Sequence, residues 1–263
     1  MNLEDVKAVA AGVVARGRAA VRAGLDIVAP PLALEGGRRA ERLLSPGLSS
    51  ARWAKVTFIE APVCDGCGAP QAYDLGADAR CPACLARRRA FDRVRAAALY
   101  DEASRDLILK LKRADRTDLA GLFATWLSRA ARDLIEDADA VAPVPLHPLR
   151  LIQRRFNQAA EIARPLARRA GLAYLPDAVI RRRDTPSQGG RSASGRRRNV
   201  VAAFAAPRSQ WKNIEGRRIL LVDDVITTGA TADACARVLK AAGAACVHVA
   251  AVARVQERDA GAI

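Results

Sequence analysis

Residues 218–231 constrain the fold of this chain more than any other stretch. The run Ile-Leu-Leu-Val at 219–222 contains no polar residue, which is typical of a strand buried on both faces of a parallel sheet. Two carboxylates, Asp223 and Asp224, follow it directly, at the strand end where open α/β sheets bind ligands. The sequence therefore predicts an α/β fold with a ligand site beyond this strand.

A hydroxyl-rich glycine loop follows the two carboxylates and opens a predicted helix that Gly243 ends. A loop of this kind presents backbone N–H groups and the positive end of the helix dipole, so it favours a phosphate. The carboxylates suit hydroxyl groups or a metal, so the two parts together predict a sugar phosphate as ligand. The other interpretation is an ordinary buried strand and capped helix, but paired acids rarely coincide with such a loop by accident. The loop residues are Thr227, Thr228, Gly229, Ala230 and Thr231.

Composition adds a strong positive charge. The 263 residues carry a formal net charge of +15, which favours polyanionic partners such as nucleic acid or phosphorylated metabolites. A genome that uses Arg and Ala freely explains the same composition equally well. Neither a signal peptide nor an apolar run long enough to span a membrane is apparent, so we expect a cytoplasmic protein with reduced thiols.

Four cysteines have the spacing of a zinc ribbon. Two C-x-x-C turns, separated by residues 68–80, would each present two thiolates and together complete a tetrahedral site. Because every position is a cysteine, we expect a structural zinc with no open coordination position. Disulfides or a redox pair are the alternative, which a reducing compartment disfavours. The predicted ligands are Cys64, Cys67, Cys81 and Cys84, whereas Cys235 and Cys246 are predicted to be core residues.

The rest of the chain divides into three predicted parts: an N-terminal helical segment at 1–55, the ribbon at 56–92 and the α/β domain at 93–263. Within the last part, hydrophobic periodicity and turn residues predict alternating strands and helices. Asn157 is expected to cap one helix, and Pro165 to kink or break it. The predicted strands are 96–100, 141–145, 200–204 and 245–252, and the predicted helices are 104–112, 118–137 and the segment after 157.

Basic residues gather in two predicted loops and on one helix. The strand at 141–145 is expected to lie beside the strand at 219–222, so Arg154 and Arg155 after it would face the same crevice. Residues 181–199 are rich in Arg and small polar residues, which indicates a mobile cationic loop. It would serve as a lid over an anionic substrate, as a nucleic-acid track or as a solvated linker. His147, Lys110 and Lys112 are interpreted as structural or solvent-exposed residues.

At Asp223–Thr231 the chain resembles the type I phosphoribosyltransferases. The resemblance implies a parallel sheet flanked by helices, and binding of 5-phosphoribosyl-1-pyrophosphate (PRPP) with Mg²⁺. Asp223 and Asp224 would be catalytic residues that hold the ribose hydroxyls and the metal, and the loop at 227–231 would surround the 5-phosphate. Arg154 or Arg155 would meet the pyrophosphate.

A four-cysteine ribbon ahead of this motif resembles the ComF family of competence-associated proteins. The match covers residues 55–255 and includes Leu107–Lys112, Pro143–Pro145 and Arg155–Ala159. It also includes a lid-like set of anion-binding residues. The resemblance implies a cytoplasmic role in DNA uptake, with single-stranded DNA and a competence helicase or other DNA-processing proteins as partners. ComF proteins often carry a double ribbon, but no cysteine precedes Cys64, so the first ribbon would be degenerate. The lid-like residues are Thr185, Gln188, Arg196 and Asn199.

Two functions remain open from the sequence. The first is a phosphoribosyltransferase, in which pyrophosphate leaves PRPP and an unidentified acceptor attacks the ribose. The second is a binding module that grips single-stranded DNA and keeps the PRPP site for sensing or structure. Pyrophosphate release and the salt dependence of DNA binding would distinguish the two.

Overall fold

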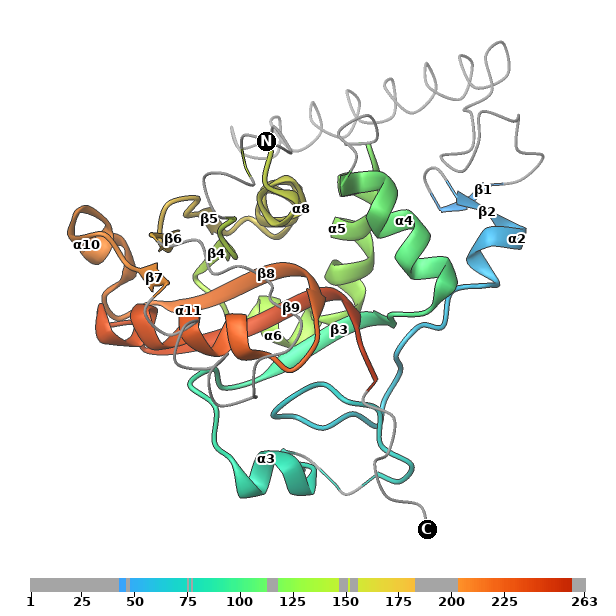
Figure 1. The fold of residues 1–263 in the computed structure, drawn as a ribbon, viewed down its shortest axis with the longest axis horizontal. Helices are drawn as coiled ribbons and strands as arrows, with labels where there is room; N and C mark the ends of the chain where they lie inside the picture. The colour runs from blue at the N-terminus through green and yellow to red at the C-terminus, as the bar shows by residue number, and fades with distance from the viewer. Residues whose placement is uncertain are drawn as a thin grey trace, which may run out of the picture. The chain divides into compact units, whose positions relative to one another are not determined.

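The computed structural model describes residues 43–45, 48–74, 76, 78–112, 118–146, 151, 156–182 and 203–256 (Figure 1). Contacts divide the chain into two compact units, residues 1–53 and 54–263. The described part of the first unit is an antiparallel pair, β1 (Leu43–Ser45) and β2 (Leu48–Ser49), followed by helix α2 (Ser50–Trp53). The helix predicted near the N-terminus lies outside the described residues.

The second unit is built on a parallel sheet, as the sequence predicts. Five strands pair in the order β3-β9-β8-β4-β5, and every pairing in this sheet is parallel. The central strands are buried on both faces, which explains their unbroken apolar runs. The strands are β3 (Val94–Leu99), β4 (Ala140–Pro143), β5 (Ala173–Tyr174), β8 (Arg218–Ile226) and β9 (Cys246–Arg254).

Helices cover both faces of this sheet (Figure 1). Helix α11 (Ala230–Ala241) packs on the face that carries Ile219, Leu221, Val247 and Val249. Helices α5 and α8 contact the sheet from the opposite side, where the intervening strand residues are equally buried. The helices on that side are α4 (Glu102–Lys112), α5 (Leu119–Ala130), α6 (Arg132–Glu136) and α8 (Gln158–Ala170).

Short elements complete the second unit. Strands β6 and β7 pair antiparallel, and the backbone N–H of Arg182 donates to the carbonyl of Ala203. These contacts bring together the two ends of the segment 183–202, which contains most of the predicted cationic loop. The short elements are α3 (Pro82–Ala86), β6 (Ile180–Arg181), β7 (Phe204–Ala205), the 3₁₀ turn η1 (Arg208–Gln210) and α10 (Trp211–Ile214). None of the helices formed by the described residues is long and apolar enough to cross a membrane.

Two helix predictions were wrong in detail. The single helix expected at 118–137 is two helices, because Ala131 leaves the helical region with φ −114° and ψ 29°. A kink or a break was expected at Pro165; of these, the break does not occur, since α8 runs through this residue. Ile162 and Leu166 on either side are fully buried, and their packing offsets the roughly 3 kcal/mol that an interior proline costs a helix.

One cysteine differs from its predicted environment. Cys235 is fully buried in α11, which confirms it as a core residue. Cys246 is only half-buried, and its thiol donates to Asp92 Oδ2 at 3.2 Å. The expectation of an apolar setting failed because Asp92 comes from a segment far away in the sequence.

The outer edge of β3 is covered by the segment that precedes the cysteines. The N–H of Ile59 donates to the carbonyl of Ala97 at 3.0 Å, and the N–H of Leu99 donates to the carbonyl of Thr57 at 2.8 Å. Phe58 bridges to the same strand and stacks edge-on against Trp126, with ring centroids 5.0 Å apart. This segment therefore joins the sheet in backbone bonding and in packing.

Candidate functional site

The turn between β8 and α11 has the geometry of an anion cradle. Gly229, which precedes the first helical residue, has φ 73°, a left-handed conformation that glycine adopts without strain. A Cβ at this position would also meet the ring of Phe91 at 3.4 Å. Asp223 and the whole turn Thr227–Thr231 line one small cavity of about 60 Å³. The structure thus brings the predicted loop and the first predicted carboxylate together.

The two carboxylates lie inside β8, which extends further than the apolar run predicts. Asp223 pairs with Ala251 of β9, and Asp223 Oδ1 accepts a hydrogen bond from the N–H of Asp224 at 2.8 Å. Burial, followed by the neighbouring charge of Asp224, raises the pKa of Asp223 well above its usual value. A carboxylate held in this way has a strong tendency to gain a proton, a hydroxyl partner or a cation.

Lys112 is a site residue that sequence reasoning missed. Its Nζ lies 2.6 Å from Asp224 Oδ2, and both side chains are largely buried, with 21% and 16% exposure. The sequence indicated only that Lys112 follows the apolar face of a helix, which is also typical of a solvated lysine. Lys110 has that predicted surface role, since it pairs with Asp106 one helical turn away at 3.2 Å.

Strand β4 lies directly beside β8, as predicted. Pro143 pairs with Val222, and the N–H of Val144 donates to the carbonyl of Val222 at 2.9 Å. Asn157 caps α8, because its Oδ1 accepts from the N–H of Ala159 at 3.1 Å while its Nδ2 donates to the carbonyl of Val144 at 3.0 Å. The loop that joins β4 to α8 therefore starts and ends beside β8. The predicted anion-binding residues Arg154, Arg155, Thr185, Gln188, Arg196 and Asn199, and also His147, lie outside the described residues.

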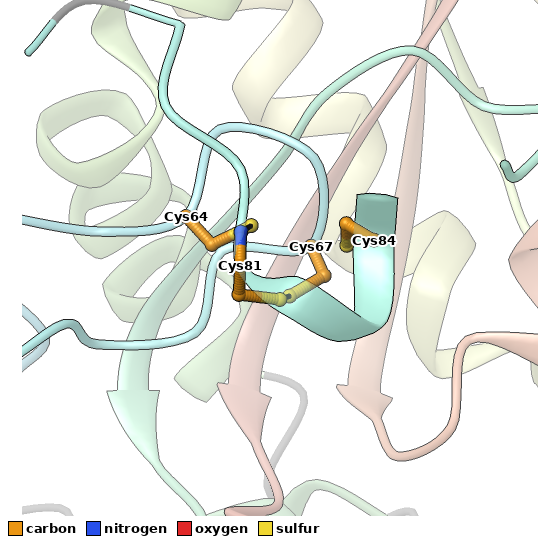
Figure 2. A group of neighbouring side chains, drawn as sticks. All are labelled: Cys64, Cys67, Cys81 and Cys84. Atoms are coloured by element: carbon orange, nitrogen blue, oxygen red, sulfur yellow. Dashed lines mark hydrogen bonds between the residues drawn. The ribbon is translucent and has the colours of Figure 1, made fainter. Parts of the chain in front are cut away.

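The four predicted metal ligands form one cluster (Figure 2). Figure 2 shows their side chains converging from the loop that contains Cys64 and Cys67 and from the start of α3. All four sulfur atoms lie within 4.8 Å of one another. Cys67 Sγ and Cys81 Sγ are 3.8 Å apart, the separation of two thiolates about 2.3 Å from one tetrahedral zinc. The donor set therefore fits zinc, which would be held by these thiolates alone.

Hydrogen bonds and burial divide the protons unevenly among these thiols: the hydrogen bond to Cys64 raises the pKa of Cys67, and burial raises the pKa of Cys84 to about 12. The thiol of Cys67 and the backbone N–H of Cys81, which donates to Cys64 Sγ at 3.2 Å, lower the pKa of Cys64 to about 4. The first turn needs a glycine, since Gly68 has φ 70° and a Cβ there would meet the carbonyl oxygen of Val94 at 2.9 Å. The cluster is thus shaped by local backbone geometry and by contact with β3.

The segment that carries the four cysteines packs against the turn Thr227–Thr231 and the elements beside it. Asp233, in the first turn of α11, accepts from the N–H of Ala90 at 2.6 Å. The guanidinium of Arg254, at the end of β9, donates to the carbonyl of Cys67 at 2.7 Å. A second cavity of about 60 Å³ lies between the two parts. Its lining residues are Cys67, Ala83, Cys84, Arg89, Phe91, Ile226, Thr227, Thr228, Gly229 and Arg254.

A charged network fixes the same segment to the edge of the sheet. Asp65, only 6% exposed, binds Arg93 and Arg95 at 2.7 Å each, and both arginines also contact Asp133 at 2.8 Å. Burial opposes ionisation of Asp65, but the two arginines outweigh it and lower the pKa of this carboxyl. The contribution of this network to stability is therefore present near neutral pH and is lost as Asp65 takes up a proton in acid.

The class of the domain follows from a family comparison. The model described as "Phosphoribosyl transferase domain" matches residues 157–260, from the cap of α8 past the end of β9. This region contains β8, the turn and α11. The second unit therefore contains a phosphoribosyltransferase-type domain.

The curated relatives define the family more closely. Competence protein F of Haemophilus influenzae is 31% identical over 198 residues, which cover 73% of this chain and 85% of that protein. DNA utilization protein YhgH of Escherichia coli K12 is 31% identical over 201 residues, with 74% and 86% covered. A glutamine PRPP amidotransferase structure from B. subtilis is 25% identical over 53% of this chain and 26% of that chain, with a TM-score of 0.34. The chain belongs to the ComF family of competence-associated proteins with a phosphoribosyltransferase-like domain.

Proposed function

We propose that the pocket beyond β8 binds PRPP together with Mg²⁺. The observation that carries this proposal is that Asp223 and the turn Thr227–Thr231 line the same cavity. A phosphate group and a diol are the two recognisable ends of one phosphosugar. The turn offers amide and hydroxyl donors to the first, and the carboxylates offer acceptors to the second.

Each group in the pocket has a distinct task in the proposed complex. The amides and hydroxyls of residues 227–231 would bind the 5-phosphate, and Asp223 and Asp224 would accept hydrogen bonds from the ribose hydroxyls. Mg²⁺, when bound with the ligand, supplies positive charge that offsets the pyrophosphate. Arg154 and Arg155 remain our proposal for the pyrophosphate contact, and a zinc ion remains our proposal for the four-cysteine cluster. A cytoplasmic location is also part of this proposal.

Calorimetric titration of the full chain with Mg-PRPP tests the proposal. We expect one binding event in the parent protein and none in Asp224→Asn, because this variant loses an acceptor while keeping its shape. Ribose 5-phosphate should bind more weakly to the same site. Absence of binding heat for Mg-PRPP in the folded parent protein would contradict the proposal.

Replacing Lys112 by methionine should weaken Mg-PRPP binding by about tenfold, or 1.4 kcal/mol. The reason is that Lys112 holds the Asp224 carboxylate at 2.6 Å and supplies positive charge beside it. The dissociation constant from the same titration measures the effect. Lys110→Met is the matched control: it lies on the same helix but pairs with Asp106. If Lys112→Met and Lys110→Met bound Mg-PRPP with equal affinity, the proposed role of Lys112 in ligand binding would be wrong.

A second candidate function is binding of single-stranded DNA. The chain has a formal net charge of +15, and its relatives include competence and DNA utilization proteins. Because each neutralised phosphate releases a counterion, affinity should fall steeply with salt. For about five phosphate contacts, the loss between about 50 and 200 mM salt is roughly a hundredfold. Fluorescence anisotropy with a labelled oligonucleotide measures this slope, and a flat response would exclude backbone-driven binding.

A further inference from the structure

A cluster of metal-binding side chains lies at the end of the sheet opposite the pocket. Cys246 and His248 begin β9 and, being two residues apart in a strand, point to the same face of the sheet. Asp137, which follows the last residue of α6, reaches this face from the helical layer. The ligand atoms of the three residues lie within 4.8 Å of one another. This group shares no residue with the four-cysteine cluster or with the pocket beyond β8.

One distance within the cluster matches that between two ligands of a metal ion, while the other is that of a direct hydrogen bond. His248 Nε2 is 3.5 Å from Cys246 Sγ and 2.7 Å from Asp137 Oδ2. A nitrogen at about 2.0 Å and a sulfur at about 2.3 Å from one tetrahedral zinc are about 3.6 Å apart. Without a metal, Nε2 pairs with Asp137 and the thiol of Cys246 donates to Asp92; a cation placed between the three atoms would replace these hydrogen bonds.

The surroundings of the cluster also favour a bound cation. Arg218 contacts Asp137 Oδ1, so this carboxylate is oriented from outside with Oδ2 directed at His248. Supporting contacts of this kind typically orient metal ligands. One carboxylate and one thiolate would supply two negative charges to a zinc ion, while Arg218 adds a positive charge on the outer side of Asp137. The side chain of Asp137 is 27% exposed, which leaves an entry path, while His248 is 2% exposed.

A second carboxylate, Asp92, lies beside Cys246 but outside the group of three whose ligand atoms are within 4.8 Å of one another. Asp92 Oδ2 lies 3.2 Å from Cys246 Sγ and also accepts from the N–H of Val247 at 2.8 Å. Lys240 binds the other oxygen of Asp92 at 2.8 Å, which fixes that carboxylate in the same manner as Arg218 fixes Asp137. A simple ion pair between Asp137 and His248 would need only these two side chains. The thiol of Cys246 and the carboxylate of Asp92 are additional potential metal ligands beside it.

We propose that Asp137, Cys246 and His248 form a second site for a zinc-class divalent ion, with Asp92 or water as the fourth ligand. This proposal is independent of the proposed PRPP site. It assigns metal binding to the amino-terminal end of β9, where the sequence offers no C-x-x-C or His-x-x-x-His spacing. The site arises only because the fold brings α6 and β9 together.

The test is the zinc stoichiometry of the full chain, titrated against a competing chelator and checked by elemental analysis. His248→Gln and Cys246→Ala should each bind one equivalent fewer than the parent protein. Cys235→Ala is the matched control, because it removes the other cysteine outside the ribbon and should keep the parent stoichiometry. Circular dichroism verifies that each variant is folded.

The absorption spectrum of the cobalt-substituted protein gives a second test that does not depend on the metal stoichiometry. The difference spectrum between the parent protein and His248→Gln should show a site with one thiolate, while the four-thiolate spectrum of the ribbon persists in both. Equal stoichiometry and identical cobalt spectra for the parent protein and both folded variants would overturn the proposal.

Discussion

Loss of metal from the four-cysteine cluster is expected to lower the midpoint of thermal unfolding by about 10 °C or more and to weaken Mg-PRPP binding by about tenfold. The ribbon has few buried apolar side chains of its own, so ligation must supply much of its stability. Mg-PRPP binding should weaken as well, because the ribbon segment supports the turn: Phe91 packs under Gly229, and Asp233 accepts from the N–H of Ala90. Scanning calorimetry and titration with Mg-PRPP, before and after chelation, measure the two effects.

Two variants localise this effect. Cys84→Ser changes the ribbon cluster alone, whereas a chelator would also strip the second site proposed at β9. Leu85→Ala is the control, because this side chain is 70% exposed on the same short helix. An unchanged midpoint and unchanged affinity in Cys84→Ser, with loss of its metal verified, would contradict the coupling between ribbon and turn.

Replacing Asp223 by asparagine is expected to have opposite effects on binding and on stability. Mg-PRPP affinity should fall at least about a hundredfold, or roughly 2.7 kcal/mol, because the half-buried carboxylate proposed to bind the ribose hydroxyls loses its charge and one acceptor oxygen. The ligand-free protein should become more stable at neutral pH. Its thermal midpoint should rise by about 2–4 °C for each kcal/mol gained. The amide oxygen of asparagine can still accept from the N–H of Asp224, so this part of β8 keeps its local hydrogen bond.

The raised pKa of Asp223 determines how the free energy of unfolding should change with pH. Burial and Asp224 raise the folded-state pKa of Asp223, so the folded protein holds this proton more tightly than the unfolded chain. The free energy of unfolding should therefore decrease as pH rises from about 3.9, the usual pKa of aspartate, to the raised folded value. The advantage of the variant should appear over this range and vanish in acid. Asp224→Asn, which breaks an ion pair with Lys112, should show no such gain. A variant at position 223 that is no more stable at neutral pH would contradict this account.

The sequence predicts the centre of the fold well because local patterns report it directly. The apolar run of β8 reflects burial on both faces, and the glycine of the turn reflects a backbone angle that other residues avoid. The C-x-x-C spacing similarly encodes the geometry of each metal-binding turn. In these cases the residues that produce the feature are neighbours in the chain, so their pattern is sufficient.

Features that depend on distant partners were not predictable in this way. Asp223 and Asp224 belong to β8 because its pairing with β9 continues to Ile226, and the apolar run gives no sign of that extension. Lys112 pairs with Asp224 only because the end of α4 lies near β8 in the folded chain. Cys246 likewise looks apolar among its neighbours, yet its environment is set by Asp92. Charged side chains that pair across elements therefore account for most of what the sequence left open.

The backbone bonds between residues 57–59 and β3 have a consequence for the solubility of shortened forms. A chain trimmed to begin at residue 93 would leave the outer N–H and C=O groups of this strand unpaired. Such an open edge recruits strands from other molecules and promotes aggregation. Residues 57–59 thus protect the edge of β3 from pairing with other molecules, apart from any part they have in ligand binding.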